Sequence, residues 1–416
     1  MQICIFEDEK TEQFNPLTYS RPVYELVCGV STLREKISRA FPKAKVSLHC
    51  RSYLEETLKN QNPKNDINKI SDKECLFING RILFNEQIAE QLKKIKDDKV
   101  FLSGKDIVAV KLLDQKLSSI KNKLPNLFSK NSFGKIPSQQ IDATLTEYIW
   151  DLIKQNPEEL VNDTKYFSSK VKRSKIKIKA AGVQWVNRKN IFIKNGVKLK
   201  PGVVLDATNG PIFIDKNAII HPNVVIEGPV YIGENTIVKS GATLYANVSI
   251  GKNCKVGGEI EDTIMLPYSN KQHLGFIGHA YLGSWVNLGA NTNCSDLKNN
   301  YGNIKVKVNN KLINTNTRFL GTIIGDHSKT AINTMLNTGT VIGFSSNIYG
   351  AGFPNKYIPS FSWGGCQQLV TYQLEKAEET ASIVFERRNK AFNNTDKKLF
   401  QKIFDITKIE RQGFRN

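Results

Sequence analysis

The chain has 416 residues, of which 40% are hydrophobic and 9% aromatic. This composition excludes a disordered chain, and the length allows two or three domains with buried cores. The net charge of +20 at pH 7 suits a nucleic acid, an anionic membrane or a phosphorylated small molecule as partner. No apolar run approaches the roughly 20 residues that cross a membrane, and the opening letters MQICIFEDEK turn acidic too early for a secretory signal. We therefore expect a cytoplasmic protein without a membrane partner.

The basic residues and the cysteines narrow the class of partner further. The densest basic run, KVKRSKIKIKAAG (residues 170–182), lacks the interleaved aromatic residues of a single-strand binding platform. We expect a solvated basic face or strand there, and no nucleic-acid partner. The seven cysteines are odd in number and include no C-x-x-C pair, which predicts mostly buried thiols with neither a disulfide framework nor a metal site.

The first segment in chain order reads as an α/β domain. MQICIF is strand-like, NPLTYSRPVYELVCGVSTLREKI (residues 15–37) leads into a helix, and CLFINGRILFN (residues 75–85) reads as a later strand. The last two segments resemble the P-L-T-x-x-R-P-K stretch and the strand ending in N-G-D of sugar-1-phosphate nucleotidyltransferases. The resemblance implies a Rossmann-like nucleotidyltransferase domain, which we place at residues 1–195. It also implies a nucleoside triphosphate substrate, with Mg²⁺ as cofactor if the domain is active.

The residues that carry the chemistry in those enzymes differ here. The loop that should be rich in glycine reads EDEKTEQF, Val23 replaces the lysine of R-P-K, and Arg81 replaces the metal-binding aspartate of N-G-D. Because Mg²⁺ prefers carboxylates together with substrate phosphates, the loss of that aspartate removes a principal ligand. Two alternatives stay open. Either the substitute groups Asp8, Arg21, Lys36 and Arg81 transfer a nucleotidyl group, or the domain keeps only a binding or structural role.

Further along the same domain, the apolar spacing of LTEYIWDLIKQNPEEL (residues 145–160) predicts a helix. We expect it to end near Pro157, because proline lacks the backbone donor and clashes with the preceding turn. The lysine-rich text around it, residues 103–195, is assigned to the rest of this domain and to its connection with the next.

A repeat of six residues then fixes the architecture. Since six is neither the helical period of 3.6 nor the strand alternation of two, each unit must be a short strand followed by a corner. Three units make a triangular coil, and stacked coils bury a continuous aliphatic column. The first inward positions are Ile214, Ile220, Ile226, Ile232, Val238, Leu244, Ile250 and Val256.

The pattern resumes twice, which leaves two interruptions, residues 263–275 and 293–321. A solenoid places its insertions on one face, often the binding face, so both segments are candidates for a site. The later inward positions are predicted to be Phe276, Leu282, Leu288, Ile324, Thr330, Leu336, Ile342 and Ile348.

Coils of this kind resemble the left-handed parallel β-helix of the hexapeptide acyltransferases, and we assign residues 196–365 to it. That resemblance implies a homotrimer with coenzyme A bound between adjacent coils. The segment HLGFIGHAYLGSWVNLGANTNCSDLKNNYGNIKVK (residues 273–307) resembles the acetyltransferase site of the bifunctional enzymes that make UDP-N-acetylglucosamine. It implies acetyl transfer from acetyl-CoA to the amine of a sugar phosphate such as glucosamine-1-phosphate.

Within this resemblance, His273 takes the position of the general base. An amino sugar is an ammonium at neutral pH and attacks a thioester only after losing a proton, which an imidazole with a pKa near 6.5 can accept. The alternative is a turn histidine bonded to a carbonyl. Nothing in the sequence indicates an activated thiol at Cys294, so an acyl relay through it is disfavoured. The other histidines are assigned structural roles: His49, His221, His279 and His327.

The same resemblance assigns further contacts. The predicted substrate-binding residues are Asn287, Asn300, Tyr301, Lys305 and Lys271. The predicted cofactor-binding residues are Ala290, Ile332 and Ala351.

Two departures affect substrate binding. Phe276 replaces the tyrosine of the motif, and Glu261 and Asp262 stand where similar enzymes have a lysine and an asparagine. Carboxylates repel a sugar phosphate, so we expect another cation to bind it. The nearest in sequence are Lys271, Lys298 and Lys305.

Residues 366–416 read as a helical tail that packs against the coil or a neighbour. One helix carries Leu374, Ala377, Ala381, Val384 and Phe385, and a second, from about Thr395, carries Leu399, Ile403 and Ile406. Two alternatives to acetyl transfer stay open. One is a nucleotidyltransferase whose β-helix only oligomerises, and the other is a non-catalytic sugar-nucleotide-binding protein.

Overall fold

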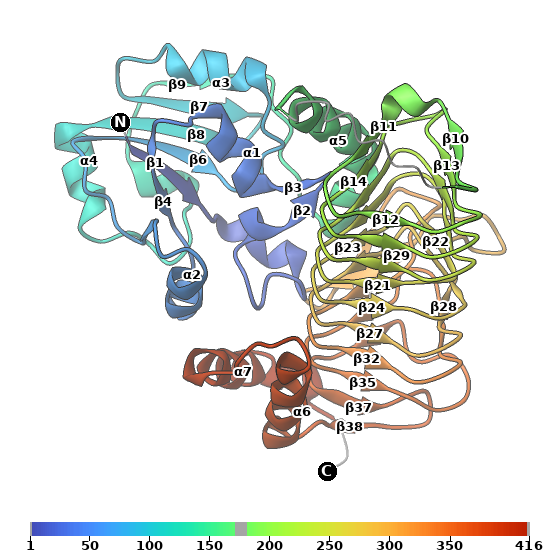
Figure 1. Cartoon of the computed structure of the whole chain (residues 1–416). Helices are drawn as coiled ribbons and strands as arrows, with labels where there is room; N and C mark the ends of the chain where they lie inside the picture. The colour runs from blue at the N-terminus through green and yellow to red at the C-terminus, as the bar shows by residue number, and fades with distance from the viewer. Residues whose placement is uncertain (1, 171–180, 414–416) are drawn as a thin grey trace.

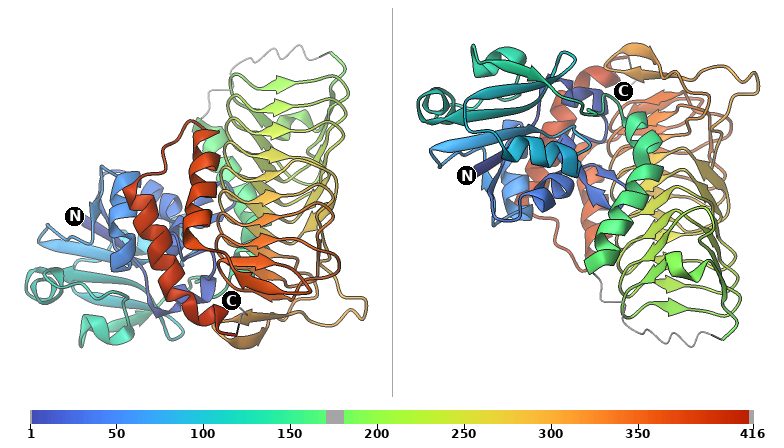
Figure 2. Two further views of the ribbon diagram at one scale, coloured as in Figure 1. Left: turned by 90° about the horizontal axis from the view of Figure 1, so that it is seen from below. Right: turned by 90° about the horizontal axis from the view of Figure 1, so that it is seen from above.

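The computed structural model describes residues 2–170 and 181–413. An α/β domain and a tall column of stacked coils stand side by side, and two carboxy-terminal helices lie in the angle between them (Figures 1 and 2). The basic run expected to form a solvated face, residues 170–182, falls almost entirely outside the described residues.

The amino-terminal domain is built on a seven-stranded mixed sheet in the order β5-β4-β1-β6-β8-β7-β9. The first four of these strands are parallel, and β8 runs antiparallel to both β6 and β7. The apolar runs of β1 and β6 are buried on both faces, as central parallel strands require. The strands are β1 (Gln2–Phe6), β4 (Lys45–Leu48), β5 (Asp66–Ile67), β6 (Glu74–Asn79), β7 (Lys99–Ser103), β8 (Asp106–Leu113) and β9 (Ser138–Gln140).

Five helices and a small hairpin complete this domain and confirm the predicted α/β class. The hairpin joins β2 (Val27–Cys28) to β3 (Ser31–Thr32). The acidic loop after β1 folds into the 3-10 helix η1 (Glu9–Phe14). The helices are α1 (Leu33–Ala40), α2 (Glu55–Gln61), α3 (Glu86–Lys93), α4 (Asp114–Lys121) and α5 (Ile149–Lys170).

Helix α5 does not end near Pro157, as the sequence predicted, but continues to Lys170. Buried side chains on both sides of the proline accept hydrogen bonds from the backbone of the β2–β3 hairpin. The Asn156 side chain accepts a hydrogen bond from the Gly29 N–H at 2.7 Å, and Asp163 accepts one from the Val30 N–H at 2.9 Å. These tertiary bonds offset the roughly 3 kcal/mol that a proline costs inside a helix.

The column has three parallel faces, and the left-handed parallel β-helix expected from the resemblance to the hexapeptide acyltransferases is confirmed. The first face contains β10 (Gln184–Val186), β13 (Val204–Asp206), β16 (Val225–Glu227), β19 (Thr243–Leu244), β22 (Glu259–Glu261) and β25 (Phe276–Gly278), followed by the pair β28 (Asn293–Cys294) and β33 (Met335–Leu336). The second face contains β11 (Ile191–Ile193), β14 (Ile212–Ile214), β17 (Val230–Ile232), β20 (Val248–Ile250), β23 (Ile264–Met265), β26 (Tyr281–Leu282), β31 (Ile323–Ile324), β34 (Val341–Ile342) and β36 (Tyr357–Ile358). The third face contains β12 (Lys198–Leu199), β15 (Ile219–Ile220), β18 (Ile237–Val238), β21 (Lys255–Val256), β24 (Asn270–Lys271), β27 (Asn287–Leu288), β32 (Lys329–Thr330), β35 (Asn347–Ile348), β37 (Ser362–Gly364) and the antiparallel β38 (Leu369–Thr371).

The inward column of the early coils agrees with the six-residue pattern. All eight positions predicted from Ile214 to Val256 are buried. Asparagines occupy left-handed corners, for example Asn217, Asn235 and Asn253, where their short polar side chains tolerate a positive φ. Because β10 and β11 already stack on the next coil, the boundary expected near residue 195 falls inside the first coil.

Two predictions about the later coils are wrong. Residues 263–275 are not an insertion, because β23 and β24 continue the second and third faces through them. Phe276 does not point inward either: it pairs with Glu259 on the outer side, and Ile277 is the buried residue. Breaks in the six-residue phase are the cause. The corner after β21 is shortened, so that the inward residues Val256 and Ile260 are four positions apart, and the inward residues Ile277 and Leu282 are five positions apart.

The second predicted interruption is real. Between β28 and β31 the chain leaves the coil and forms the antiparallel hairpin β29 (Lys305–Val308) and β30 (Lys311–Asn314). Ile304 and Val306 are buried in a core shared with the amino-terminal domain, and the Asn309 side chain donates to the Glu12 carbonyl at 3.2 Å.

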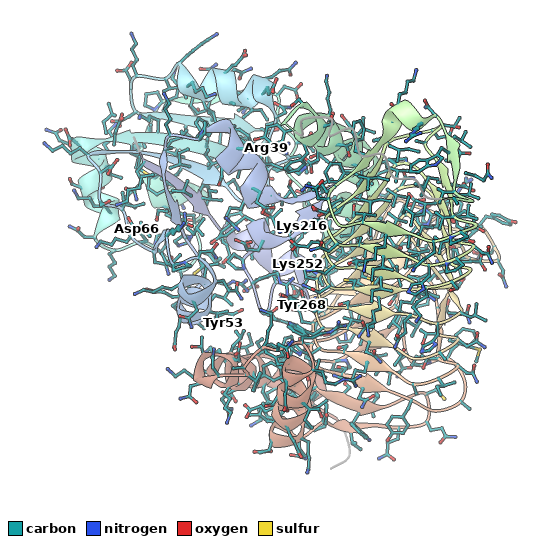
Figure 3. The ribbon with its side chains drawn as sticks, in the orientation of Figure 1. Arg39, Tyr53, Asp66, Lys216, Lys252 and Tyr268 are labelled. Atoms are coloured by element: carbon teal, nitrogen blue, oxygen red, sulfur yellow. The ribbon has the colours of Figure 1, made fainter. Side chains whose placement is uncertain are left out.

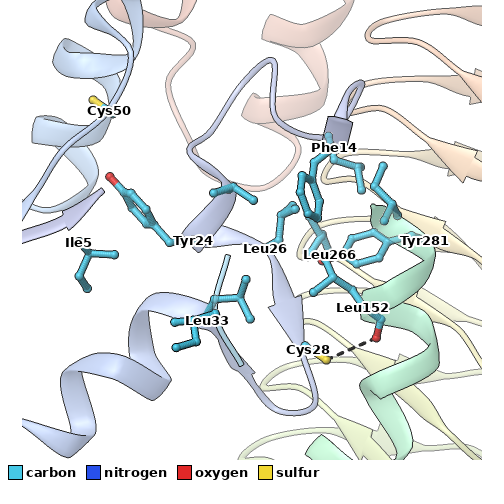
Figure 4. Close-up of a cluster of buried hydrophobic side chains, with 14 of the residues drawn as sticks. Ile5, Phe14, Tyr24, Leu26, Cys28, Leu33, Cys50, Leu152, Leu266 and Tyr281 are labelled. Atoms are coloured by element: carbon cyan, nitrogen blue, oxygen red, sulfur yellow. Dashed lines mark hydrogen bonds between the residues drawn. The ribbon is translucent and has the colours of Figure 1, made fainter. Parts of the chain in front are cut away.

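The amino-terminal domain is joined to the second face by one hydrophobic core. Leu266 and Tyr281 of the coils lie among Phe14, Leu26 and Leu152 (Figure 4). The Tyr281 hydroxyl accepts from the Val27 N–H at 2.8 Å and donates to the Val27 carbonyl at 3.0 Å. The second face is therefore not free to bind another chain.

The two predicted tail helices are present as α6 (Leu374–Glu386) and α7 (Asn394–Ile406). They cover the later coils at the corner between the second and third faces, where Phe385 meets Trp285 and His327. Lys216, Lys252 and Tyr268 lie along the same corner on earlier coils (Figure 3). Phe385 stacks on Trp285 with ring centroids 4.3 Å apart. The tail thus packs against its own coil.

Candidate functional site

His273 lies on the corner of residues 272–275, between the third and first faces. Its side chain is exposed. The corner is tied to the next coil, because the Leu274 carbonyl accepts from the Asn291 N–H at 3.1 Å and the Phe276 N–H donates to the Asn293 side chain at 2.9 Å. An exposed imidazole on a fixed corner is available to a bound substrate.

The predicted cofactor-binding residues lie on this same edge of the column. The Asn333 N–H donates to the Ala290 carbonyl at 2.8 Å, so Leu274, Ala290 and Ile332 belong to the corners of successive coils. We call this row the apolar edge and define it as Leu274, Ala290, Ile332, Tyr349 and Phe353. Leu274 is 71% exposed and Ile332 69%, which is unusual for such large apolar side chains.

Ala351 lies close to the end of this edge. It is exposed, and its carbonyl accepts a hydrogen bond from the Cys366 thiol. Cys366 is exposed and the other six cysteines are buried. Burial raises the pKa of the Cys294 thiol well above its usual range, which agrees with the expectation that it forms no acyl intermediate.

Asn287 lies on the third face, next to Asn270 of the preceding coil. The Asn270 amide donates to the Asn287 side-chain oxygen at 3.4 Å, and Arg388 after helix α6 donates to the Asn270 oxygen at 2.9 Å. The tail therefore helps to orient the amide predicted to contact the substrate.

The other predicted sugar contacts lie on the insertion. Asn300, Tyr301 and Lys305 are all exposed, and Tyr301 has a positive φ of 56°. The Asn300 side chain accepts from the Gly302 N–H at 3.1 Å. Within the described part of the chain, no hydrogen bond or ion pair links these three residues to the His273 corner.

Lys271 differs from the prediction that it binds substrate at the surface. It pairs with the inward Val256 of the coil below and is only 2% exposed. Its ammonium donates to the carbonyls of Gly257 at 2.9 Å and His273 at 2.8 Å. A lysine occupying the aliphatic position of the repeat is indistinguishable in sequence from a loop lysine once the phase is misassigned.

A charged cluster that sequence reasoning missed surrounds His279. Its Nδ1 is 2.8 Å from the Asp296 carboxylate and its Nε2 is 3.7 Å from Asp262. Burial lowers the pKa of His279, but the Asp296 hydrogen bond and the charges of Asp262, Asp296 and Glu261 raise it overall. The acidic pair that replaces the basic residues of similar enzymes thus lies beside a histidine whose pKa it helps to raise. The sequence feature that could have revealed this cluster is the spacing of about one coil between Asp262, His279 and Asp296.

In the amino-terminal domain, Arg81 and Asp8 form a bidentate ion pair. The guanidinium donates to the two carboxylate oxygens at 2.8 and 2.6 Å, and it also donates to the Thr146 carbonyl at 2.5 Å. Lys10 binds Asp106 at 2.8 Å in the same cluster. Both carboxylates that face this place are therefore paired with cations, and the residues do not fit a Mg²⁺ ion.

Arg21 and Lys36 are also held by internal partners. Arg21 forms an ion pair with Asp326 on the coil, and Lys36 is buried between Glu159 at 2.5 Å and Asp163 at 2.6 Å. The structure brings together only Asp8 and Arg81 of the four predicted nucleotidyl-site residues. The other two join the amino-terminal sheet region to the coil and to helix α5.

The two parts of the chain match two families. Residues 3–172 match the model described as sugar nucleotidyl transferase, and residues 211–246 match the bacterial transferase hexapeptide of six repeats. The chain therefore joins a sugar nucleotidyl transferase domain to hexapeptide transferase repeats. Helices long and apolar enough to span a membrane are absent from residues 2–170 and 181–413, and those residues contain no group of three His, Cys, Asp or Glu placed to hold a metal ion.

Several curated proteins are similar to this two-part chain. A bifunctional sugar-1-phosphate nucleotidylyltransferase/acetyltransferase of Sulfurisphaera tokodaii is 32% identical over 104 residues, which are 24% of this chain and 26% of that protein. The bifunctional protein GlmU of Methanocaldococcus jannaschii is 29% identical over 294 residues, 65% of this chain and 70% of that protein. This chain thus spans about a quarter of the first relative and 70% of the second.

Solved structures add little. A UDP-N-acetylglucosamine acyltransferase of Arabidopsis covers 57% of this chain and 98% of its own, with 13% identity and a TM-score of 0.29. We base no argument on so low a score.

Proposed function

We propose that the protein transfers the acetyl group of acetyl-CoA to the amine of a sugar phosphate such as glucosamine-1-phosphate. The observation that carries the proposal is the position of the exposed His273 at one end of the apolar edge, which follows the same corner from coil to coil. The similarity to relatives named as bifunctional nucleotidylyltransferase/acetyltransferase proteins supports it.

The residues present suit this chemistry. The amine nitrogen attacks the thioester carbonyl carbon, the carbon–sulfur bond breaks, and coenzyme A leaves as a thiol. His273 takes the proton that the attacking nitrogen loses and can return it to the leaving sulfur. The Asn287 amide, one coil away, is a donor for the oxyanion that forms at the carbonyl. The exposed apolar side chains of the edge, including Ile332, offer a surface for the pantetheine arm.

We further propose that the working form is a homotrimer in which the insertion of one chain completes the site of another. The solvent exposure of large apolar residues along the edge supports this. Because the amino-terminal domain covers the second face, the trimer contacts are expected on the first face and the apolar edge.

The test of the chemistry follows free thiol from acetyl-CoA with glucosamine-1-phosphate as acceptor. We expect His273→Ala to lower kcat at least about 100-fold, the usual contribution of a general base. His221→Ala is the matched control, because His221 begins the equivalent corner on an earlier coil. Thiol release that persists in His273→Ala would remove the base assignment.

The shared site is tested by mixing two inactive variants. Chains carrying His273→Ala and chains carrying Tyr301→Ala are co-expressed in equal amounts. If each site takes its histidine and its tyrosine from different chains, about a quarter of the sites are intact in random trimers. Activity no higher than that of the two parents would contradict a shared site.

A second candidate function, sugar nucleotidyl transfer, is favoured by the family match of residues 3–172. The Arg81–Asp8 pair requires that any such activity proceed without a metal ion bound at Asp8. The test measures pyrophosphate released from UTP and N-acetylglucosamine-1-phosphate, with and without a chelator. No release, together with no UTP binding by calorimetry, would leave this domain a structural role.

A further inference from the structure

The corner that carries His273 rests on an unusual interior residue. Inward positions of the repeat are aliphatic on the neighbouring strands, such as Val256 on the preceding coil and Leu288 on the following coil. At the same position of β24 the chain has Lys271, whose ammonium is enclosed in the column. A buried lysine requires partners, because an unpaired ammonium in an apolar interior is strongly unfavourable.

The space for this side chain comes from a shortened corner on the preceding coil. Between the third and first faces, the corner after β18 takes residues 239–242 and the corner after β24 takes residues 272–275, whereas the corner after β21 consists only of Gly257 and Gly258. A Cβ atom on Gly258 would lie 2.8 Å from the Lys271 nitrogen and 2.9 Å from the His273 carbonyl oxygen. The two glycines therefore leave room that the lysine fills.

The ammonium connects the two corners. It donates to the Gly257 carbonyl at 2.9 Å and to the His273 carbonyl at 2.8 Å, so the peptide that carries the imidazole is tied to the preceding coil. Hydrogen bonds from a charged donor are about twice as strong as neutral ones. We infer that Lys271 is a positioning residue for His273, which fixes the backbone of the catalytic corner from inside the column.

The effect of Lys271 on catalysis rests on the proposed function. Its two hydrogen bonds to the corners do not. The charge that acts on the ammonium is that of Glu259 on β22. Burial lowers the pKa of Lys271 to about 8, although the charge of Glu259 opposes that shift. As the pH rises through about 8, the Lys271 nitrogen changes from a charged to a neutral donor. Its hydrogen bonds to the two corners then weaken, and the His273 corner becomes less firmly held.

The experiment compares Lys271→Met with Lys255→Met. The second variant is the control and removes a lysine from the outer side of β21, the preceding strand of the same face. Hydrogen exchange of the peptide covering residues 270–280 is measured from pH 6.5 to 9 and expressed as protection factors. In the wild type we expect the protection of this corner to decline as the pH rises through about 8. Lys271→Met should lower the protection about 10-fold at pH 7 and should show no such decline. The control should match the wild type. Thermal melting identifies any unfolded variant, in which case Lys271→Gln replaces it.

The catalytic readout is separate. We expect Lys271→Met to lower kcat for thiol release about 10-fold with less than a threefold change in KM for acetyl-CoA, because a misplaced base slows the chemistry without weakening coenzyme binding. Unchanged protection, or lost protection with an unchanged kcat, would overturn the positioning role. If the wild type releases no thiol with any amino sugar, the proposed function fails while the exchange data still test the tie.

Discussion

Arg81 and Asp8 are joined by two hydrogen bonds, from Nε at 2.8 Å and from Nη2 at 2.6 Å. The arginine side chain is completely buried. A metal ion cannot take up the same carboxylate oxygens without displacing the guanidinium, so this pair decides the chemistry open to the amino-terminal domain.

The first prediction concerns this pair. Arg81→Met leaves the largely buried Asp8 carboxylate without its cation, and breaking such a pair costs about 3–5 kcal/mol. We expect a clear fall in the urea midpoint of the amino-terminal domain. The double variant Asp8→Asn, Arg81→Met should recover much of the loss, because it leaves no unpaired charge. Equal midpoints for the single and double variants would show that the pairing itself is not what stabilises this region.

A second prediction separates buried from exposed lysines. Lys36 and Asp163 are both fully buried, and their ion pair joins α1 to α5. Lys36→Met should therefore lower stability by about 3–5 kcal/mol. Lys45 is the matched control, since its pair with Asp66 at 2.8 Å lies at the surface. There the loss should be much smaller, because solvent screens an exposed ion pair. Urea titration of both variants measures the difference.

The third prediction is a pH dependence centred on His279. Its pKa in the folded state is raised, so its contribution to stability is fully present below the ordinary value of 6.5 and is lost as the pH rises through the folded pKa. His279→Gln should remove this dependence. Thermal melting between pH 5.5 and 8.5 checks it, and parallel curves for the two proteins would contradict the prediction.

A fourth prediction addresses the contact between the domains. The Tyr281 hydroxyl is bonded to both the N–H and the carbonyl of Val27. Tyr281→Phe leaves these backbone groups without their partner, at a cost of about 1–3 kcal/mol. We expect faster hydrogen exchange in the β2–β3 hairpin with little change in the far coils. Unchanged exchange in that hairpin would mean that the Tyr281 hydroxyl does not stabilise this contact between the domains.

Much of the fold was predictable because its rules are local. The aliphatic residue at every sixth position and the asparagines at the corners indicate the column without any knowledge of distant partners. The tail helices followed from their apolar spacing in the same way. Phe276 was misassigned because the inward residues Ile277 and Leu282 are five positions apart instead of six, and a change of one position turns a side chain to the other side of a strand.

The site was less predictable, because charges find partners far along the chain. The sequence alone determined the aliphatic coils and the long insertion of residues 293–321, and it indicated His273 as the candidate base, since period and motif are written in consecutive letters. Only the tertiary structure decided that Lys271 lies inside the column, that Arg21 and Lys36 serve internal ion pairs, and that His279 lies between carboxylates. The physical reason is that burial and electrostatic pairing depend on residues brought close by folding, and Lys36 and Asp163, 127 positions apart, leave no local trace of their contact.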